Sequence, residues 1–492
     1  MSMIQIKNLR FGYPGSAEDV FEDLNLNLDT DWRLGLIGRN GRGKTTLLRL
    51  LCGEYDYTGS IRASVRFARF PAEVDDPSES AEAVLRRMCP EAQDWQIARE
   101  LSLLDVSEDV LDRPFDTLSG GEQTKLCLAA LFLREDCFAL IDEPTDHLDA
   151  AGREIVANYL RHKRGFLLVS HDRAFLDGCV DHILSINRNS IDLQSGNYSA
   201  WRLGFDRKEQ FERAQEQKLR KDIAQLNEAA RRSAGWSDRL ESTKRGERMS
   251  GLRPDTGYIG HKSAKLMRRA KAAEARRERA IEQKSALLQD AEEAESLKLS
   301  PIVHHSERLA ELRSACVNYG ARTVCENISF HIRRGERIAL DGPNGCGKSS
   351  LLKRIAGEDV PHSGAVERAA GLIISLVPQD TSQLRGSVFD LAQARGIDRT
   401  LYLAILRKLG FPRSQFEYDL SRFSQGQKKK ALIAASLCER AHLYIWDEPL
   451  NYLDIDARIQ IEALLLQSQP TMLFVEHDRA FRESVATRAI RI

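Results

Sequence analysis

Several common features are missing from this sequence of 492 residues. It has no run of 18 apolar residues, so no segment has the length and hydropathy of a membrane-spanning helix. Residues 1–10 have neither the apolar core nor the cleavage pattern of a secretory signal, so we expect a cytoplasmic protein. The nine cysteines are an odd number without a C-x-x-C pair, which favours scattered reduced thiols over disulfides or an iron or zinc site.

Net charge is also absent, because 72 Lys and Arg balance 72 Asp and Glu. The charge is uneven along the chain. Residues 231–279 hold 15 Lys or Arg and 6 Asp or Glu, a balance of +9, so the remainder carries −9. Charge therefore points to a partner only for the basic segment.

With 42% hydrophobic residues, a chain of this length can form two or three domains with separate cores.

A phosphate-binding motif occurs near the start of the chain. Residues 34–37 form a short apolar run that predicts a buried strand, and the next residues, GRNGRGKT from Gly38, match G-x-x-x-x-G-K-[ST]. Backbone amides of such a loop and a helix N-terminus can wrap phosphates. Lys44 can neutralise the β- and γ-phosphates, and Thr45 can bind Mg²⁺.

Three further motifs follow, and each has a chemical role. LSGGEQ begins at Leu118, CFALIDEP predicts a buried strand that ends at Asp142 and Glu143, and FLLVSHD brings another strand to His171. One carboxylate can complete a Mg²⁺ shell, a second can orient or deprotonate water, and an imidazole can sense the γ-phosphate. Together these motifs resemble the ATP-binding cassette (ABC) ATPases, whose signature is LSGGEQ.

The same motif series returns later in the chain. GPNGCGKS begins at Gly342, FSQGQ begins at Phe423, LYIWDEP ends at Asp447 and Glu448, and FVEHD contains His477. The offsets of the second P-loop, signature, strand-end aspartate and histidine from the first are 304, 305, 305 and 306 residues. A nearly constant offset over four motifs indicates a tandem duplication.

We therefore predict an α/β protein with two tandem P-loop ABC ATPase domains joined by an α-helical hairpin linker. The expected ranges are 1–200 for the first cassette, 201–304 for the linker with a tip loop at about 236–261, and 305–492 for the second cassette. The linker has no proline before Pro254, and helical spacing of its apolar residues predicts two helices of roughly 30 residues, each rising roughly 45 Å.

The resemblance to ABC ATPases implies two composite nucleotide sites, because two cassettes of that family close head to tail. Site one combines the first P-loop with the second signature, and site two the second P-loop with the first signature. Candidate ATP-binding residues are Tyr13, Gly38, Asn40, Gly41, Gly43, Lys44, Thr45, Thr46, Ser119, Gly120, Gly121, Tyr319, Gly342, Asn344, Gly345, Gly347, Lys348, Ser349, Ser350, Gln379, Ser424 and Gly426. Candidate catalytic residues are Glu143, Glu448, His171 and His477. Candidate Mg²⁺ ligands, direct or through water, are Thr45, Asp142, Ser349, Gln379 and Asp447.

Two departures from the family pattern fall in site one. Ala72 stands where a glutamine is expected after the P-loop helix, whereas the second cassette has Gln379. Gln425 stands at a usual glycine of the second signature. Asp146 also replaces the asparagine that the chain itself has at Asn451, and the sequence alone assigns this residue no role.

The whole chain resembles the ABC-F translation factors, which join tandem cassettes by a charged helical linker. WxLGLIGRNGRGKTTLLRLL, RPFDTLSGGEQTK, the WS…DTGYIG loop and LYIWDEPLNYLD most resemble the Lsa-type antibiotic-resistance ribosomal protection proteins. The resemblance implies a monomeric ATPase that uses ATP and Mg²⁺. It also implies a partner, the bacterial 70S ribosome, whose E site the linker enters beside P-site tRNA and rRNA. The drugs implied are lincosamides, pleuromutilins and streptogramin A, which bind near the peptidyl-transferase centre.

The basic linker tip is the candidate ribosome contact, because cations bind phosphate backbones by releasing counterions. The candidate contacts are Lys244, Arg245, Arg248, Met249, Leu252, Arg253 and Tyr258. The same charge pattern is also compatible with a helical hairpin whose charged faces are simply solvated. The chain as a whole is also compatible with a general ABC-F translation factor without a resistance role, or with a tandem ATPase subunit of a membrane transporter.

The two departures in site one predict that it hydrolyses ATP more slowly than site two. Glu448→Gln should therefore lower the single-turnover rate of hydrolysis more than Glu143→Gln does. The measurement is release of labelled phosphate from ATP bound at excess enzyme. A larger loss with Glu143→Gln would contradict this order.

Overall fold

The structure is a computed structural model, and it describes residues 2–15, 19–72, 74–187, 191–208, 299–319, 322–411 and 413–492, with residues 210, 211, 214, 218 and 221. The chain divides into two units, one of Met1–Trp201 with Glu295–Ile492 and the other of Arg202–Ala294. The seven tip candidates from Lys244 to Tyr258 and most of the predicted helical hairpin lie outside the described residues. Within the described part, no helix is both long and apolar enough to span a bilayer.

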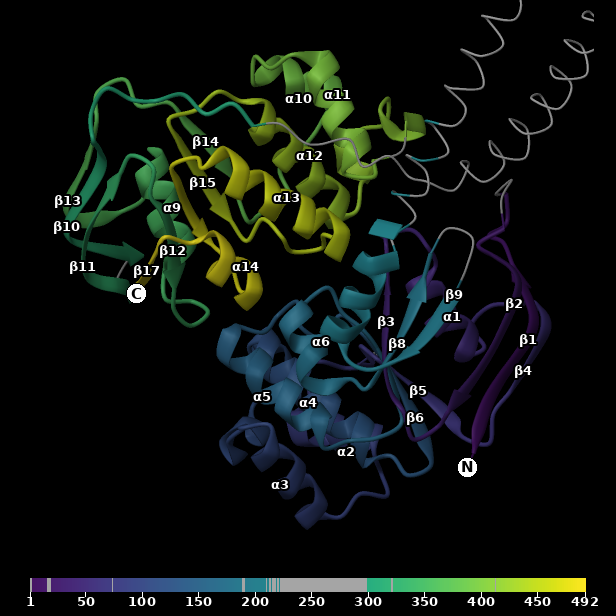
Figure 1. The fold of residues 1–492 in the computed structure, drawn as a ribbon. Coiled ribbons are helices and arrows are strands. Elements are labelled where there is room, and N and C mark those ends of the chain that lie inside the picture. Colours follow the sequence, from purple (N-terminus) through teal and green to yellow (C-terminus); the bar gives the residue numbers. More distant parts are fainter. Residues whose placement is uncertain are drawn as a thin grey trace, which may run out of the picture. The chain divides into compact units, whose positions relative to one another are not determined.

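The first cassette contains a six-stranded sheet and a separate three-stranded sheet (Figure 1). The order of the larger sheet is β5-β6-β7-β3-β8-β9, and its strands are parallel except for β9, which pairs antiparallel with β8. In the smaller sheet, β1 pairs antiparallel with β2 and β4. The strands are β1 (Met3–Phe11), β2 (Phe21–Asp29), β3 (Arg33–Gly38), β4 (Thr58–Arg62), β5 (Arg66–Phe70), β6 (Cys137–Asp142), β7 (Phe166–Val169), β8 (His182–Ile186) and β9 (Ile191–Ser195).

The helices of the first cassette lie between its strands along the chain. They are α1 (Lys44–Leu51), α2 (Ala81–Met88), α3 (Asp94–Leu103), α4 (Gly120–Leu133), α5 (Ala150–Arg161) and α6 (Arg173–Cys179), with short 3₁₀ turns η1 (Glu108–Asp112) and η2 (Phe115–Thr117). α4 begins with the signature. Ser119 is its N-cap, because the Ser119 side chain accepts a hydrogen bond from the backbone N–H of Glu122 and the Glu122 carboxylate accepts one in return.

The second cassette repeats this plan. Its larger sheet has the order β14-β15-β16-β12-β17 with all pairs parallel, and in its smaller sheet β10 pairs antiparallel with β11 and β13. The strands are β10 (Arg308–Tyr319), β11 (Arg322–Arg333), β12 (Arg337–Asp341), β13 (His362–Arg368), β14 (Ile374–Val377), β15 (Leu443–Asp447), β16 (Met472–Val475) and β17 (Arg488–Arg491). The helices are α9 (Lys348–Ala356), α10 (Val388–Ala394), α11 (Arg399–Lys408), α12 (Gln425–Cys438), α13 (Ile455–Ser468) and α14 (Arg479–Val485), with η3 (Arg413–Gln415) and η4 (Leu420–Arg422).

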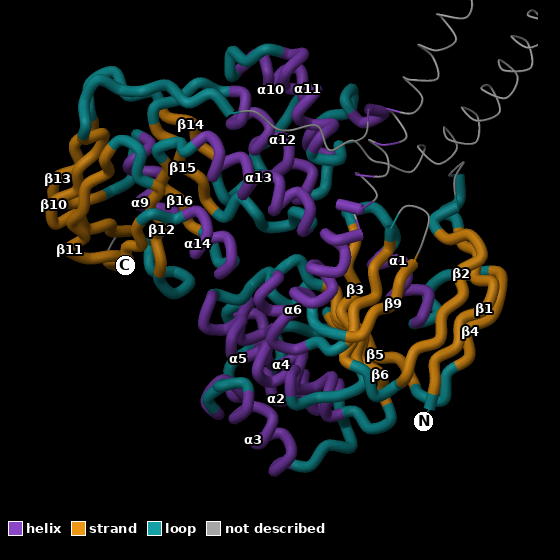
Figure 2. The backbone as a smooth tube through the Cα atoms, viewed as in Figure 1, coloured by secondary structure: helices purple, strands orange, loops and turns teal. Residues whose placement is uncertain are grey.

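Figure 2 shows the same alternation of strands and helices in both cassettes. The predicted α/β class and the duplication are confirmed, because β5, β6, β7, β3 and β8 have the order of β14, β15, β16, β12 and β17. Central strands are buried on both faces, as a parallel sheet covered by helices requires. The side chains of Leu34 and Leu36 in β3 are fully buried, as the apolar run predicts.

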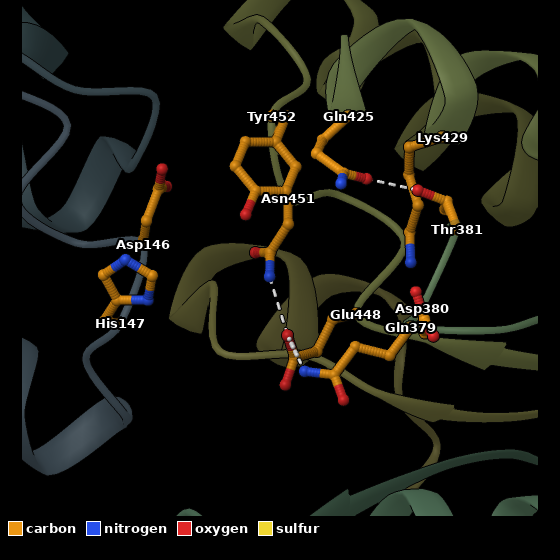
Figure 3. Close-up of a pocket in the computed structure, with 10 residues that line it drawn as sticks. All are labelled: Asp146, His147, Gln379, Asp380, Thr381, Gln425, Lys429, Glu448, Asn451 and Tyr452. Carbon is orange, nitrogen blue, oxygen red and sulfur yellow. Dashed lines mark hydrogen bonds between the residues drawn. The ribbon is translucent and has the colours of Figure 1, made fainter. Parts of the chain in front are cut away.

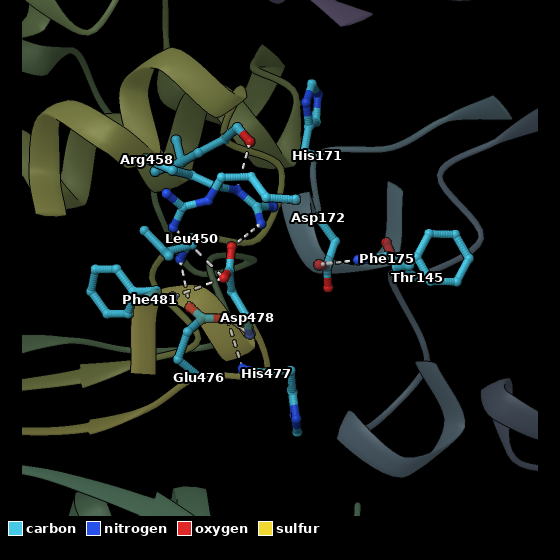
Figure 4. Close-up of polar contacts among 12 residues, drawn as sticks. Thr145, His171, Asp172, Phe175, Leu450, Arg458, Glu476, His477, Asp478 and Phe481 are labelled. Atoms are coloured by element: carbon cyan, nitrogen blue, oxygen red, sulfur yellow. Dashed lines mark hydrogen bonds and ion pairs between the residues drawn. The ribbon is translucent and has the colours of Figure 1, made fainter. Parts of the chain in front are cut away.

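A buried ion pair stabilises each cassette behind its predicted catalytic histidine. Arg153 Nη1 lies 2.9 Å from Asp172 Oδ2 in the first cassette. In the second cassette, Arg458 Nη1 lies 3.2 Å from Asp478 Oδ2 (Figure 4). Asp172 is also the N-cap of α6, since its Oδ1 accepts from the backbone N–H of Phe175 at 3.0 Å. One carboxylate thus fixes both α5 and the segment that follows β7.

Asp172→Ala should strongly destabilise the first cassette. It removes the helix cap and leaves the buried guanidinium of Arg153 without its carboxylate, which costs about 3–5 kcal/mol of free energy of unfolding. Urea denaturation followed by tryptophan fluorescence measures this change. Glu82→Ala is the matched control, because it breaks an exposed ion pair with Arg86 and should have a much smaller effect. Equal losses in the two variants would contradict a role for the buried pair.

Candidate functional site

Each P-loop joins the end of a central strand to the start of a helix. In the first cassette, Gly43 precedes α1 with φ +90°, and a Cβ added there would lie 2.6 Å from Val20 Cγ1. Only glycine meets both conditions without strain. Lys44 Nζ donates to the carbonyl oxygen of Gly38 at 2.7 Å, so its ammonium lies inside the loop. Loop amides, helix N-terminus and ammonium together suit a polyphosphate.

The second P-loop has the same geometry. Gly347 has φ +91°, and Lys348 Nζ donates to the carbonyl oxygens of Gly342 and Pro343, both at 2.8 Å. Gly41 and Gly345, at equivalent positions, have φ of +83° and +80°. The candidate phosphate-binding glycines of both cassettes therefore lie in matching loops.

Tyr13 and Tyr319 are candidate ATP-binding residues, which by the ABC resemblance would stack on adenine, and both lie beside the P-loop helices. Tyr13 Oη is 2.8 Å from Thr46 Oγ1, and Tyr319 Oη is 3.0 Å from Ser350 Oγ. The exposed fractions of the two tyrosines are 42% and 50%, so each retains open ring surface near its P-loop. Stacking on adenine stays a prediction.

The donor set of site two fits Mg²⁺. Ser349 Oγ donates to Gln379 Oε1 at 3.3 Å and lies beside the Asp447 carboxylate. Among the described residues, Asp447 Oδ1 is buried without a hydrogen-bond partner, and burial raises the pKa of Asp447 to about 6. A hard cation bound by hydroxyl, amide and carboxylate oxygens would satisfy this orphaned atom.

Site one has a smaller donor set. Thr45 hydrogen-bonds to Asp142, and burial raises the pKa of Asp142. Ala72 offers only a methyl group where Gln379 supplies an amide in the other cassette. A cation in site one would therefore depend more on water for its remaining ligands.

The candidate base of site two is held by two amides (Figure 3). Glu448 Oε2 accepts from Gln379 Nε2 at 2.9 Å and from Asn451 Nδ2 at 2.7 Å, while Oε1 lies 3.5 Å from His477 Nε2. Burial alone would raise the pKa of Glu448. The neighbouring His477 imidazole and the Gln379 amide outweigh burial, so the pKa is below its ordinary value. Glu448 is therefore ionised at neutral pH.

The candidate base of site one has a different environment. Glu143 Oε2 accepts from the backbone N–H of His171 at 3.2 Å, and Oε1 lies 3.3 Å from His171 Nε2. Burial and the carboxylate of Asp146 raise the pKa of Glu143 to about 8. Burial, with the charge of Lys44, lowers the pKa of His171 well below its ordinary value, so this imidazole is neutral and does not counter the shift.

The histidine and two neighbouring side chains account for this difference between the sites, because His477 lowers the pKa of Glu448 whereas the neutral His171 does not lower that of Glu143. The amides of Gln379 and Asn451 donate to Glu448, and their equivalents beside Glu143 are Ala72, which has no donor, and Asp146, which adds negative charge. Sequence reasoning identified Ala72 but assigned no role to Asp146. The signal was present in the sequence, since EPTDHLD and EPLNYLD differ at this position.

The P-loop asparagines reach the opposite cassette at equivalent points. Asn40 Nδ2 donates to the carbonyl oxygen of Tyr452 at 2.9 Å, and Asn344 Nδ2 is 3.5 Å from the carbonyl oxygen of His147. Tyr452 and His147 are 305 residues apart, the offset of the duplication. The two cassettes therefore make reciprocal contacts through the loop that follows each candidate base.

Each signature packs against the same loop of its own cassette. A Cβ added at Gly426 would lie 3.0 Å from the carbonyl oxygen of Tyr452, and one added at Gly120 would lie 3.0 Å from His147 Cβ. The first signature thus approaches the second P-loop through His147, and the second approaches the first P-loop through Tyr452. This is the pairing predicted for the composite sites, whose residue roles stay predictions.

A cavity of about 250 Å³ lies beside Glu448 (Figure 3). The first cassette contributes the loop that precedes α5, and the second contributes the segment after β14, the start of α12 and the loop that precedes α13. The lining residues are Asp146, His147, Gln379, Asp380, Thr381, Gln425, Lys429, Glu448, Asn451 and Tyr452.

Comparisons with known proteins agree with this geometry. A family profile described as "ABC transporter" matches residues 21–146 and 325–451. Ribosome protection protein VmlR of Bacillus subtilis (strain 168) is 28% identical, over 98% of this chain and 85% of that protein. Energy-dependent translational throttle protein EttA of Haemophilus influenzae is 25% identical, over 96% of this chain and 88% of that protein.

A solved structure shares the fold. The crystal structure of the complex of archaeal ribosomal stalk protein aP1 and archaeal ribosome recycling factor aABCE1 contains a chain that matches with a TM-score of 0.65 and 21% identity. The match covers 98% of this chain and 87% of that chain, so both cassettes are included.

The unequal carboxyl groups predict unequal pH profiles. In a Glu448→Gln background, single-turnover hydrolysis at site one should rise between pH 7 and 9, because Glu143, with a pKa of about 8, must lose its proton before it can accept one from water. In a Glu143→Gln background, hydrolysis at site two should change little over the same range. Adding Asp146→Asn should shift the site-one profile to lower pH. A flat site-one profile would show that Glu143 is ionised throughout.

Proposed function

This chain belongs to the ABC family of ATPases, and from that premise we propose that it is an ATP-dependent ribosomal protection factor. It is an ATP hydrolase, and it resembles the ABC-F proteins. The observation that carries the proposal is the match to VmlR over 98% of this chain and 85% of VmlR. The match includes residues 231–279, where the charge balance is +9.

The residues of each site have defined tasks in this proposal. Lys44 and Lys348 neutralise phosphate charge in the two P-loops, and Tyr13 and Tyr319 stack on the bases. Thr45 and Asp142 would hold Mg²⁺ in site one, and Ser349, Gln379 and Asp447 in site two. When bound, this ion neutralises charge on the phosphate oxygens.

Glu448 and Glu143 accept a proton from the attacking water in sites two and one. At Glu448, Oε2 already accepts two amide hydrogen bonds, so Oε1, which lies 3.5 Å from His477 Nε2, is the oxygen that would accept the proton. His477 and His171 lie next to these carboxylates, and in this proposal each imidazole senses the γ-phosphate. Ser119, Gly120 and Gly121 complete site two, and Ser424 and Gly426 complete site one.

In this proposal, contacts between the two cassettes link ATP binding to ribosome binding. ATP favours the closed arrangement in which Asn40 contacts Tyr452 and Arg173 Nη2 lies 2.7 Å from Glu462 Oε2. The closed protein binds the E site of the bacterial 70S ribosome as a monomer in the cytoplasm. The basic linker tip holds rRNA or P-site tRNA phosphates and lowers the affinity of lincosamides, pleuromutilins and streptogramin A. Hydrolysis reopens the cassettes and releases the factor.

A second candidate function is a general translation factor without a resistance role. EttA, whose name states a translational throttle, matches over 88% of its own length. Both candidates require ribosome binding by the ATP-bound protein. They differ in whether the protein changes drug susceptibility.

Protein with both Glu143→Gln and Glu448→Gln should sediment with bacterial ribosomes in ATP and not in ADP, because it closes on ATP and cannot reopen. In this background, neutral substitutions at Lys244, Arg245, Arg248 and Arg253 should weaken comigration. They should also make ribosome binding less sensitive to salt concentration. Absence of comigration in protein that binds ATP would contradict ribosome action and favour the ATPase subunit of a membrane transporter.

Expression in a drug-susceptible host separates the two ribosomal functions. A protection factor raises the inhibitory concentration of at least one of the three drug classes, and the Glu143→Gln/Glu448→Gln variant does not. Unchanged concentrations for all three classes, together with ATP-dependent ribosome binding, would favour the general translation factor.

A further inference from the structure

We propose that Lys429 is a positioning residue for hydrolysis at site two, where it holds Gln379 and Glu448 in register with each other. The residue lies on α12, and only 3% of it is exposed. Its Nζ donates to the carbonyl oxygen of Pro378 at 2.8 Å and to that of Asp447 at 2.7 Å. These carbonyls belong to the peptide groups directly before Gln379 and Glu448, so one ammonium joins both peptide groups.

The two residues that Lys429 aligns are themselves in contact. Gln379 Nε2 donates to Glu448 Oε2 at 2.9 Å, and Ser349 Oγ donates to Gln379 Oε1 at 3.3 Å. The side chain of Gln379 therefore has to meet a hydroxyl and a carboxylate at once. A small shift of β14 against β15 would break one of these bonds, and the ammonium of Lys429 bridges the ends of both strands.

A second contact attaches the same segment to α12. Thr381 Oγ1 donates a hydrogen bond to Gln425 Oε1 (Figure 3). Gln425 is the residue that replaces a glycine in the second signature. The segment after β14 is thus bound to the signature helix at two points, by Gln425 beyond Gln379 and by Lys429 before it.

The first cassette lacks both anchors and the residue that they hold. Thr124 stands at the position of Lys429, Gly120 at that of Gln425, and Ala72 replaces Gln379. By contrast, Lys430, the next lysine of α12, has a counterpart in the first cassette, which is Lys125. Lys429 is therefore a feature of site two and not a general requirement of the signature helix.

The bend at the candidate base does not require this lysine. Glu448 has φ +45°, and Glu143 has φ +47° although Thr124 occupies the equivalent helix position. The backbone N–H groups of both glutamates also donate to strand carbonyls at 2.9 Å. What Lys429 adds is the alignment of Gln379 with Glu448.

The inference rests on the proposed roles of site two and not on ribosome binding, so purified protein can test it. In a Glu143→Gln background, where site two alone hydrolyses ATP, Lys429→Met should lower the single-turnover rate about 10- to 100-fold, the usual effect of misplacing a catalytic group. The affinity for a fluorescent ATP analogue should stay within about twofold of the background value, because Lys429 is not in the P-loop. Lys429→Arg, which restores a cationic donor, should recover part of the rate.

Two controls separate positioning from folding. Lys429→Met keeps the length of the side chain but leaves the carbonyl oxygens of Pro378 and Asp447 without their donor, so the melting temperature should fall, and the rates are compared at a temperature at which both variants are folded. Lys428→Met is the matched control on the same helix, since Lys429 and not Lys428 donates to the two carbonyls, and it should leave the rate unchanged. In a Glu448→Gln background, Lys429→Met should leave the slow hydrolysis at site one unchanged.

The inference would be overturned by an unchanged site-two rate in Lys429→Met. Equal losses at both sites would overturn it as well, because they would indicate general damage to α12. If Glu448→Gln itself does not lower hydrolysis, the proposed assignment of site two fails, and Lys429 has no reaction to position. A normal effect of Glu448→Gln with no effect of Lys429→Met overturns the inference alone.

Discussion

A buried carboxylate needs hydrogen-bond donors, and this requirement governs the difference between the two sites. Both candidate bases follow a central parallel strand in the same backbone conformation, with φ of +47° and +45°. The fold therefore brings each carboxylate to the same place. What differs is the donors around it. His477 and the Gln379 amide hold the pKa of Glu448 below its ordinary value, whereas burial with Asp146 nearby raises the pKa of Glu143 to about 8.

Much of this arrangement follows from the sequence. Parallel strands place their carboxyl ends at one edge of the sheet, so motifs at the ends of residues 34–37, CFALIDEP and FLLVSHD must meet there. The nearly constant offset of the second motif series predicts the same arrangement in the second cassette. The contrast between Ala72 and Gln379 was also visible, because an absent side chain can be inferred from an alignment of the two halves.

The effects of Asp146 and Lys429 could not be predicted in this way. A carboxylate at the position of Asn451 matters only because it lies beside another buried carboxylate, and a sequence gives neither distance nor burial. Three consecutive lysines, Lys428 to Lys430, are typical of a solvated stretch of chain. All three are buried here, since α12 packs against the sheet, and tertiary contacts decide what each ammonium meets.

The reciprocal contacts of Asn40 and Asn344 join two halves of one polypeptide. A homodimer with the same contacts would form by a bimolecular reaction, and dilution would dissociate it. Here the partner is always present at an effective concentration set by the connecting segment. Assembly of the nucleotide sites is therefore unimolecular, and its rate and extent do not depend on how many copies of the protein a cell contains.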